Sequence, residues 1–145
     1  MAIAERERRS QASEITAWSI SRHADDRKQR RGLYISNGSN SAVFDVEISS
    51  TYSESSQANP TDLSPLNLAV LPPGEYVVFG GEKYAWELPQ ERGSFTDSIS
   101  PIMNNPGWKV TRIVLTDSHG TTWQRDHGLL KEAQSSPNAP AQAKS

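Results

Sequence analysis

The densest run of hydrophobic positions lies in Trp108–Leu115, where large and β-branched residues occur on both alternating faces. This pattern predicts a strand that is buried on both sides for much of its length. The polar run Thr116–Gly120 contains Asp and Gly, which favour a hairpin turn with a longer loop. Thr121–Arg125 is then predicted to return as a second strand. We expect Trp123 to lie across the core with its indole N–H at an edge, because a buried Trp usually needs a hydrogen-bond acceptor.

A second hairpin is predicted from Gly32–Ser36 and Ala42–Ser50, which flank the turn sequence Asn37–Asn40. The second strand alternates between two faces. One face carries the apolar residues Ala42, Phe44, Val46 and Ile48, and the other carries the polar residues Asp45, Glu47 and Ser49. We therefore expect Phe44 to face the core and Asp45 to face solvent or a polar partner.

Shorter apolar runs predict further strands. These runs are Ala17–Ser21, with Trp18 and Ile20 on its buried face, Leu66–Leu71, Glu75–Phe79 and Tyr84–Leu88. Two long segments without periodicity are expected to be loops, namely Thr51–Pro65 and Arg92–Pro106. Turn-bounded strands at regular spacing favour a mainly β protein. The predicted fold is a single antiparallel β-sandwich of about seven strands with immunoglobulin-like topology, and a small barrel is the second choice.

The two ends of the chain differ in composition from the middle. Residues 1–15 favour a short helix, but the apolar stripe is too thin to dock strongly, so we expect an exposed, frayed or partner-dependent extension. Residues 133–145 contain too few apolar residues to fold, and we expect a disordered tail. The β-sandwich domain is therefore expected to span residues 16–132.

Composition narrows the function classes. The 145 residues carry a net charge of −2 and include no cysteine, which excludes disulfides and thiolate chemistry. Acidic residues interleave with the basic residues of the N-terminal part, so we expect no nucleic-acid partner. The sequence contains neither an apolar run of membrane-spanning length nor a secretory signal, and we expect a cytoplasmic protein.

The sequence contains no recognisable catalytic constellation. A P-loop, a dinucleotide-binding glycine pattern and a G-x-S-x-G elbow are absent. Four acidic residues cluster without singling out a catalytic pair, namely Glu75, Glu82, Glu87 and Glu91. A second polar set lies at the two ends of one predicted strand, roughly 20 Å apart at strand rise, and comprises Asp117, His119, Asp126 and His127. We predict no enzyme activity, no cofactor and no metal.

Two groups of residues are candidates for an interaction surface. The first is a basic lip that would meet phosphate, an anionic membrane or an acidic partner, and it consists of Arg27, Arg30 and Arg31. The second group either packs over the core, which is the favoured interpretation, or forms a small exposed patch. Its members are Phe95, Ile99 and Ile102.

Structural roles are expected for five residues, Trp18, Phe44, Asp45, Trp123 and Arg125. If the strands that carry Asp45 and Arg125 are neighbours, the two side chains are expected to form a bidentate ion pair that fixes sheet register.

The sequence contains three short motifs that are considered together. They are Asn37-x-Ser39 ahead of Val43–Val46, Leu71–Gly74, and Thr116-Asp117-x-x-Gly120-x-x-Trp123-x-Arg125. In these phrases the chain resembles uncharacterised small β-sandwich domain proteins of actinobacteria, over Glu14–Leu130. The resemblance implies one β domain, which in that group often follows a helical or membrane-spanning segment, and it implies no activity. Where that pattern often has proline, this chain has Ala42.

The long loops, the thin helix and the lack of a catalytic set favour a non-catalytic module that binds a protein partner. One alternative is association with an anionic membrane surface through the basic N-terminal segment. Another is binding of a small ligand or carbohydrate on an aromatic platform, for which the candidates are Tyr84, Trp86 and Trp108. Unprotected strand edges also favour a homodimer as a further alternative.

Overall fold

The structure, a computed structural model, describes residues 9–23, 30–53, 59–80, 86–103 and 108–133. Residues 134–145 of the predicted C-terminal tail lie outside these residues, as do Arg27 and the side chain of Arg30 in the basic lip. Among the described residues, no helix has the length and apolar character that crossing a bilayer requires.

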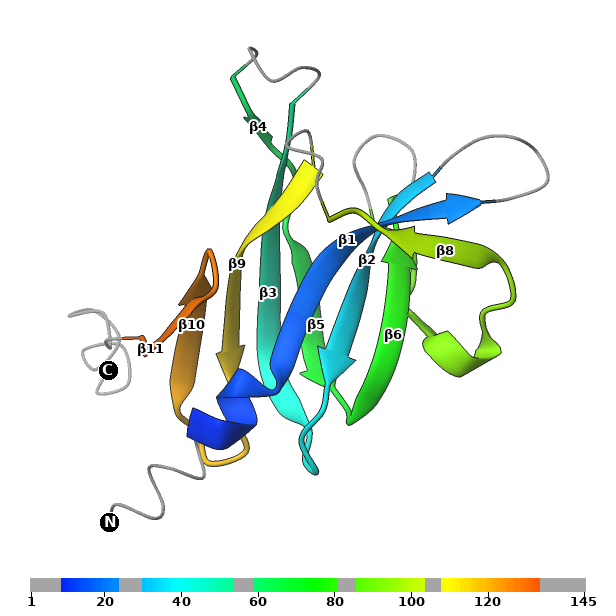
Figure 1. Ribbon diagram of the computed structural model, residues 1–145. Helices are drawn as coiled ribbons and strands as arrows, with labels where there is room; N and C mark the ends of the chain where they lie inside the picture. Colours follow the sequence, from blue (N-terminus) through cyan, green and yellow to red (C-terminus); the bar gives the residue numbers. More distant parts are fainter. Residues whose placement is uncertain (1–8, 24–29, 54–58, 81–85, 104–107, 134–145) are drawn as a thin grey trace.

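The described chain forms two antiparallel sheets (Figure 1). Sheet A has the order β7 (Gln90–Glu91), β6 (Gly74–Phe79), β2 (Arg30–Asn37), β1 (Ile15–His23) and β8 (Ser98–Pro101). Sheet B has the order β11 (Leu129–Glu132), β10 (Thr122–Asp126), β9 (Trp108–Thr116) and β3 (Val43–Tyr52), with β4 (Thr61–Asp62) and β5 (Leu66–Leu71) both paired to β3. A short 3-10 helix, η2 (Arg92–Ser94), follows β7.

The mainly β class and the antiparallel sheets are confirmed, but the number of strands and the topology are not. The described residues form eleven strands where about seven were predicted. In the immunoglobulin order the first strand lies at the edge of its sheet, whereas β1 lies between β2 and β8. The immunoglobulin-like topology is therefore not confirmed.

The main hydrophobic core lies between the two sheets, in a sandwich-like arrangement. Sheet A contributes Ile15, Leu33, Ile35 and Val78. Sheet B contributes Val43, Val46, Ile48, Leu66, Leu71, Ile113, Leu115 and Trp123. Burying such side chains stabilises the fold by about 1.5 to 3 kcal/mol each, before the entropy cost of ordering them.

The predicted hairpin between β2 and β3 is wrong, because the two strands belong to different sheets. The turn between them crosses from sheet A to sheet B and is organised by the buried side chain of Asn37. Its amide donates to the carbonyls of Ser41 and Leu71, both at 3.0 Å, and its oxygen accepts from the N–H and hydroxyl of Ser39 at 3.0 and 2.7 Å. A sequence that favours a tight turn does not determine whether the strands that it joins pair with each other.

The predicted faces of β3 are also wrong at its start. The register between β3 and β9 shifts between Phe44 and Glu47, and Asp45 has a left-handed φ of 50°. A bulge of this kind adds one residue to the strand and changes which face the following side chains occupy. Phe44 is consequently 43% exposed, whereas Val43 and Val46 enter the core.

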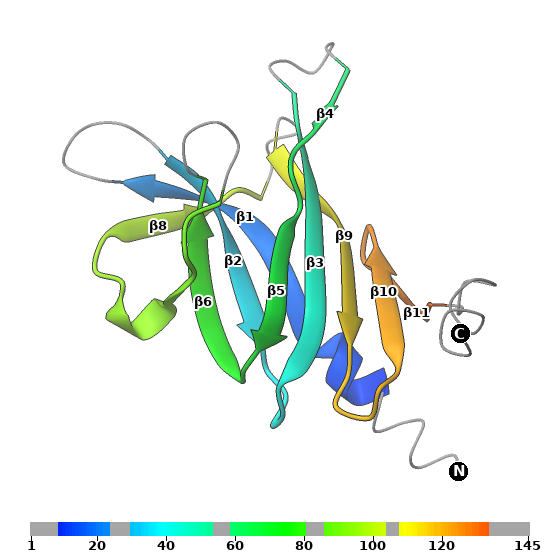
Figure 2. The ribbon, with the colours of Figure 1, turned by 180° about the vertical axis from the view of Figure 1, so that it is seen from behind.

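The strand β9 has one buried face rather than two. Ile113 and Leu115 are buried in the core, but Lys109 and Arg112 are exposed. A second register shift against β3 leaves Thr111 without a partner in the ladder. Antiparallel sheets are often solvated on one side, and Figure 2 shows no strand in front of β3, β9 and β10 on that side.

Two segments contain different structure from that predicted. The second long loop carries regular elements, η2 and β8. The strand predicted at Tyr84–Leu88 is reduced, in its described part, to a single bridge between Trp86 and Gly80, and Leu88 is exposed.

The N-terminal helix is short and docked. Residues 9–13 are helical, Ala12 is fully buried in the main core, and β1 begins at Ile15. The Gln11 side-chain amide donates to Ser41 O at 3.3 Å, while its oxygen accepts from the N–H and hydroxyl of Ser118 at 3.1 Å. The expectation of an exposed or frayed extension is therefore wrong for these residues, because polar tethers add to the thin apolar stripe. Ile15, the last residue of the expected helical extension, is the first residue of β1.

Candidate functional site

The outer face of sheet A, which points away from the main core, is partly covered by the segment from η2 to β8. A second hydrophobic cluster lies there, formed by Ile20, Val77, Phe79 and Phe95, with Ile99 packed against it. The rings of Phe79 and Phe95 stack with their centroids 5.3 Å apart. The packing interpretation of Phe95 and Ile99 is therefore confirmed, and Phe95 is not part of an exposed patch. Ile102 is also partly buried, and its N–H donates to Ser19 O at 2.8 Å.

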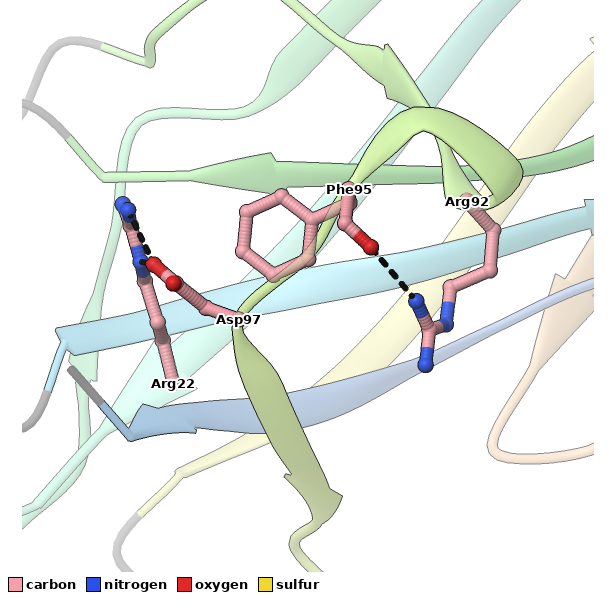
Figure 3. A network of polar contacts seen from close by, with 4 residues as sticks. All are labelled: Arg22, Arg92, Phe95 and Asp97. Carbon is pink, nitrogen blue, oxygen red and sulfur yellow. Dashed lines mark hydrogen bonds and ion pairs between the residues drawn. The ribbon is translucent and has the colours of Figure 1, made fainter.

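Arginines fasten this covering segment to the sheet (Figure 3). The Arg22 Nε donates to Asp97 Oδ2 at 2.7 Å, and the Arg22 guanidinium lies 5.4 and 5.2 Å from the ring centroids of Phe79 and Phe95. The Arg92 guanidinium donates to the carbonyl of Phe95 at 3.2 Å. These contacts make the covering segment part of the fold, and they leave the remainder of the outer face open.

The open remainder is centred on Trp18 and Tyr34. The two residues are cross-strand partners on β1 and β2, and their rings stack with centroids 4.6 Å apart and planes 11° apart. Trp18 is 38% exposed. The sequence pattern correctly places Trp18 and Ile20 on one face. The prediction that this face is buried holds for Ile20 and is wrong for Trp18, because the main core lies on the opposite face with Ile15.

Charged side chains border the stacked rings. The Tyr34 hydroxyl donates to the Glu75 carboxylate. Burial of the hydroxyl, together with this hydrogen bond and the negative charge of Glu75, raises the pKa of Tyr34 to about 12, against a smaller opposing effect of Arg92. The ring of Tyr34 is therefore held in place by Trp18 at its face and by Glu75 at its hydroxyl.

The hydrogen bond between Ile102 and Ser19 extends the contact between β1 and the covering segment beyond the pair of Ile20 and Pro101. We call the stacked pair of Trp18 and Tyr34 the aromatic strip.

The predicted basic lip is only partly described. Arg27 and the side chain of Arg30 lie outside the described residues. Arg31 lies over aromatic rings, with its guanidinium 4.3 Å from the ring centroid of Tyr52 and 5.5 Å from that of Trp108. Its charge is therefore engaged by the protein itself.

Asp45 and Arg125 do not form the predicted register-fixing pair. Asp45 lies on β3 and Arg125 on β10, and β9 separates these strands. Arg125 instead donates to the carbonyl of Ser13 at 3.1 Å, which ties the helical turn to sheet B.

The prediction for Trp123 is confirmed. Trp123 is buried, and its indole N–H donates to Asp117 Oδ2 at 2.9 Å. The other carboxylate oxygen accepts from the N–H groups of His119 and Thr121, both at 2.9 Å. Asp117 is therefore a structural acceptor that closes the hairpin loop.

The other sequence candidates for chemistry are not brought together. Asp126 and His127 lie at the end of β10 opposite to the Asp117 turn. Over the part of the chain that the structure describes, no three His, Asp or Glu side chains are placed to hold a metal ion. Among the clustered glutamates, Glu75 bonds Tyr34, whereas Glu82 lies outside the described residues.

The aromatic platform predicted from Tyr84, Trp86 and Trp108 is not observed in the described residues. Trp108 is buried, Trp86 is partly buried and donates to Ser64 O at 2.8 Å, and Tyr84 is not described. The exposed large aromatic residues of the described chain are Trp18, which stacks on Tyr34, and Phe44 on sheet B.

Two shallow polar cavities of about 390 Å³ each lie elsewhere on the surface. One is lined by the helical turn and the two adjacent turns, including Glu14, Ser39 and His119. The other lies beside the β9 bulge and is lined by residues that include Glu47, Arg112 and His127. Neither cavity is lined by Trp18 or Tyr34.

Comparison with known proteins yields no match to any family model, curated protein or solved structure.

Proposed function

We propose that the protein is a non-catalytic binding module that contacts another protein through the aromatic strip on the outer face of sheet A. The observation that carries the proposal is the exposed Trp18 ring, which stacks on the partly buried ring of Tyr34. Trp, Tyr, Met and Arg are enriched at the centres of protein interfaces, and Trp and Tyr are frequent hot spots.

The rings are ordered before any partner binds. Stacking on Tyr34 restricts Trp18, and the hydrogen bond to Glu75 restricts Tyr34. Binding therefore costs less side-chain entropy than it would for two freely rotating aromatic residues. Glu75 and Arg92 beside the rings add charges that a partner of complementary pattern would recognise.

The contacts of the arginines favour this proposal over membrane-surface association. Arg9 donates to Leu130 O at 3.0 Å and lies 5.7 Å from the ring centroid of Trp123. Arg22 is paired with Asp97, and Arg31 lies over two rings. An anionic lipid would compete with these internal partners, so each basic residue would contribute less than the usual value of about 1 kcal/mol.

The test compares two exposed aromatic residues of similar exposure on different sheets. Immobilised Trp18→Ala and Phe44→Ala proteins are incubated with extract of the source cells, and the captured proteins are quantified against the unchanged chain. We expect Trp18→Ala to weaken capture of a specific partner by about 30-fold, corresponding to about 2 kcal/mol, while Phe44→Ala retains it. Trp18→Phe keeps a stacking ring and is expected to retain most of the binding.

Thermal unfolding of each variant provides the folding control. Equal capture by all variants would contradict the proposal, as would a loss confined to Phe44→Ala. The same proteins applied to immobilised glycans distinguish the alternative ligand class, because a sugar ring also stacks on exposed aromatic rings. Trp18-dependent retention of a glycan, without any captured protein, would replace the protein partner by a carbohydrate.

A further inference from the structure

The turn between β2 and β3 contains the pair Asn37-Gly38, which is chemically reactive in an unfolded chain. The Gly38 backbone nitrogen can attack Cγ of the Asn37 side chain, because glycine has no Cβ to hinder the approach. The new N–Cγ bond forms while the bond from Cγ to Nδ2 breaks, and ammonia leaves with the amide proton of Gly38. Water then opens the cyclic imide at either carbonyl, which leaves aspartate or isoaspartate at position 37.

The folded chain holds both reacting groups in hydrogen bonds. The side chain of Asn37 is 2% exposed, and it donates two hydrogen bonds and accepts two. The Gly38 N–H donates to the carbonyl of Glu14 at 3.0 Å, so the loss of its proton is opposed. Asn37 must rotate and break its own hydrogen bonds before the Gly38 nitrogen can reach Cγ. The native fold therefore protects a pair that is reactive in the unfolded chain.

The backbone of Asn37 is also fixed on both sides. Asn37 is the last residue of β2, and it lies opposite Ile15 of β1 and Gly74 of β6. Because β2 lies between these two strands, the turn is freed only when the ends of both ladders open. Modification of Asn37 is therefore coupled to the opening of sheet A.

The modified chain cannot restore these contacts. One nitrogen of Asn37 donates to the carbonyls of Ser41 and Leu71, and a carboxylate in its place has no hydrogen to donate to either. Burial of such an unpaired charge is costly. Isoaspartate, in addition, lengthens the main chain by one carbon at the point where it crosses from sheet A to sheet B. Either product therefore disfavours refolding.

We propose that Asn37 is a site of spontaneous deamidation, protected in the native fold and exposed by unfolding. The reaction consumes only water and releases ammonia. Each period spent unfolded converts part of the population into a form that does not regain the native stability, so unfolding becomes progressively irreversible. This proposal does not depend on the aromatic strip, because it uses the chemistry of the turn alone.

The experiment follows deamidation at each asparagine by peptide mapping with mass spectrometry, in buffer and in guanidinium chloride at the same pH and temperature. We expect Asn37 to deamidate at least about a hundredfold more slowly in the folded chain, since modification then waits for a rare opening. Asn40 is exposed in the same turn, so it is the internal reference and should show a much smaller difference. Equal rates at Asn37 in the two conditions would overturn the proposal.

Gly38→Ala is the matched variant. A Cβ at position 38 would lie 2.6 Å from Glu14 Oε2, which is the end of an exposed and flexible side chain that can move aside. We therefore expect Gly38→Ala to fold and to keep the hydrogen bonds of Asn37. The added methyl group hinders ring closure, so the unfolded variant should deamidate at Asn37 about tenfold more slowly than the unfolded unchanged chain.

A refolding experiment tests the consequence. Chains held unfolded for increasing times are returned to buffer, and their denaturation midpoints are measured. The fraction that regains the original midpoint should fall in step with deamidation at Asn37, and it should persist for longer in Gly38→Ala. Deamidated molecules that regain the original midpoint would contradict the proposal. If Gly38→Ala failed to fold, the unchanged chain alone would decide the question, because its modified and unmodified molecules differ in charge and can be separated by ion exchange.

Discussion

Tyr34 illustrates how a single residue of the candidate surface is set by its neighbours. Its ring is fixed by Trp18 and its hydroxyl by Glu75, and the same surroundings raise the pKa of Tyr34 to about 12. The sequence offers no signal for this arrangement, because Tyr34 and Glu75 are brought together only by the pairing of β2 with β6.

The raised pKa predicts a loss of stability in alkaline solution. An unfolded tyrosine has a pKa of about 10, so the folded state holds the Tyr34 proton more tightly. This contribution to stability is fully present below about pH 10 and is lost as the pH rises toward 12. Denaturant unfolding across that range should show a smaller decline for Tyr34→Phe than for the unchanged chain.

Tyr76→Phe is the matched control, since the Tyr76 hydroxyl donates to the neutral carbonyl of Pro73 at 3.2 Å. It should retain the decline. If the unchanged chain and Tyr34→Phe showed the same pH dependence, the folded and unfolded states would bind the Tyr34 proton with equal affinity. That result would contradict the prediction.

At the scale of the element, the β3 bulge decides which residues face solvent. Asp45 adopts a left-handed φ of 50°, and the ladder shifts by one residue beside it. The consequence extends beyond one position, since Phe44 is turned outward and Val46 inward. Alternation read from the sequence assumes a regular strand, so it assigns Val46 to the correct face but Phe44 to the wrong one.

The bulge predicts different effects for two substitutions of Asp45. Asn adopts left-handed backbone readily, so Asp45→Asn should change the free energy of unfolding by less than about 0.5 kcal/mol. Asp45→Val should cost about 1 to 2 kcal/mol, because a β-branched residue tolerates this conformation poorly. Urea unfolding of both variants measures the difference. A large loss in Asp45→Asn would instead point to a role for the carboxylate charge.

At the scale of the whole molecule, the two sheets are joined by polar tethers as well as by the core. Asn37, at the end of β2 in sheet A, donates to Leu71 at the end of β5 in sheet B. Gln11 connects the helical turn to the two adjacent turns, and Arg125 connects it to β10 of sheet B. Buried polar groups of this kind fix one relative placement of the sheets, because any other leaves them without partners.

We predict that Asn37→Ala lowers the free energy of unfolding by about 2 to 3 kcal/mol, since it leaves the buried Leu71 carbonyl without this donor. Asn40→Ala, three residues away in the exposed part of the same turn, should cost less than about 0.5 kcal/mol. Chemical denaturation measures both effects. If the two substitutions lowered the free energy of unfolding equally, the turn in general would be the source of stability, and the hydrogen bond between the sheets would not.

The sequence by itself determined the features that depend on neighbours along the chain. The hairpin of β9 and β10 was predictable because Trp123 finds its acceptor, Asp117, only six residues away. β5 and β6 were predictable because Pro72–Gly74 separates two short apolar runs. Local turn chemistry and alternation are sufficient for such elements.

The tertiary structure alone decided which strands share a sheet, which face of β1 meets the core, and which aromatic residues stay exposed. Trp18 stays exposed on the outer face because the segment around Phe95, more than seventy residues further along the chain, covers only part of that face. Many pairings of distant segments are compatible with the same local sequence pattern. The observed pairing is the one that buries the most apolar surface and gives the buried polar groups hydrogen-bond partners over the whole fold, and no single stretch of sequence specifies it.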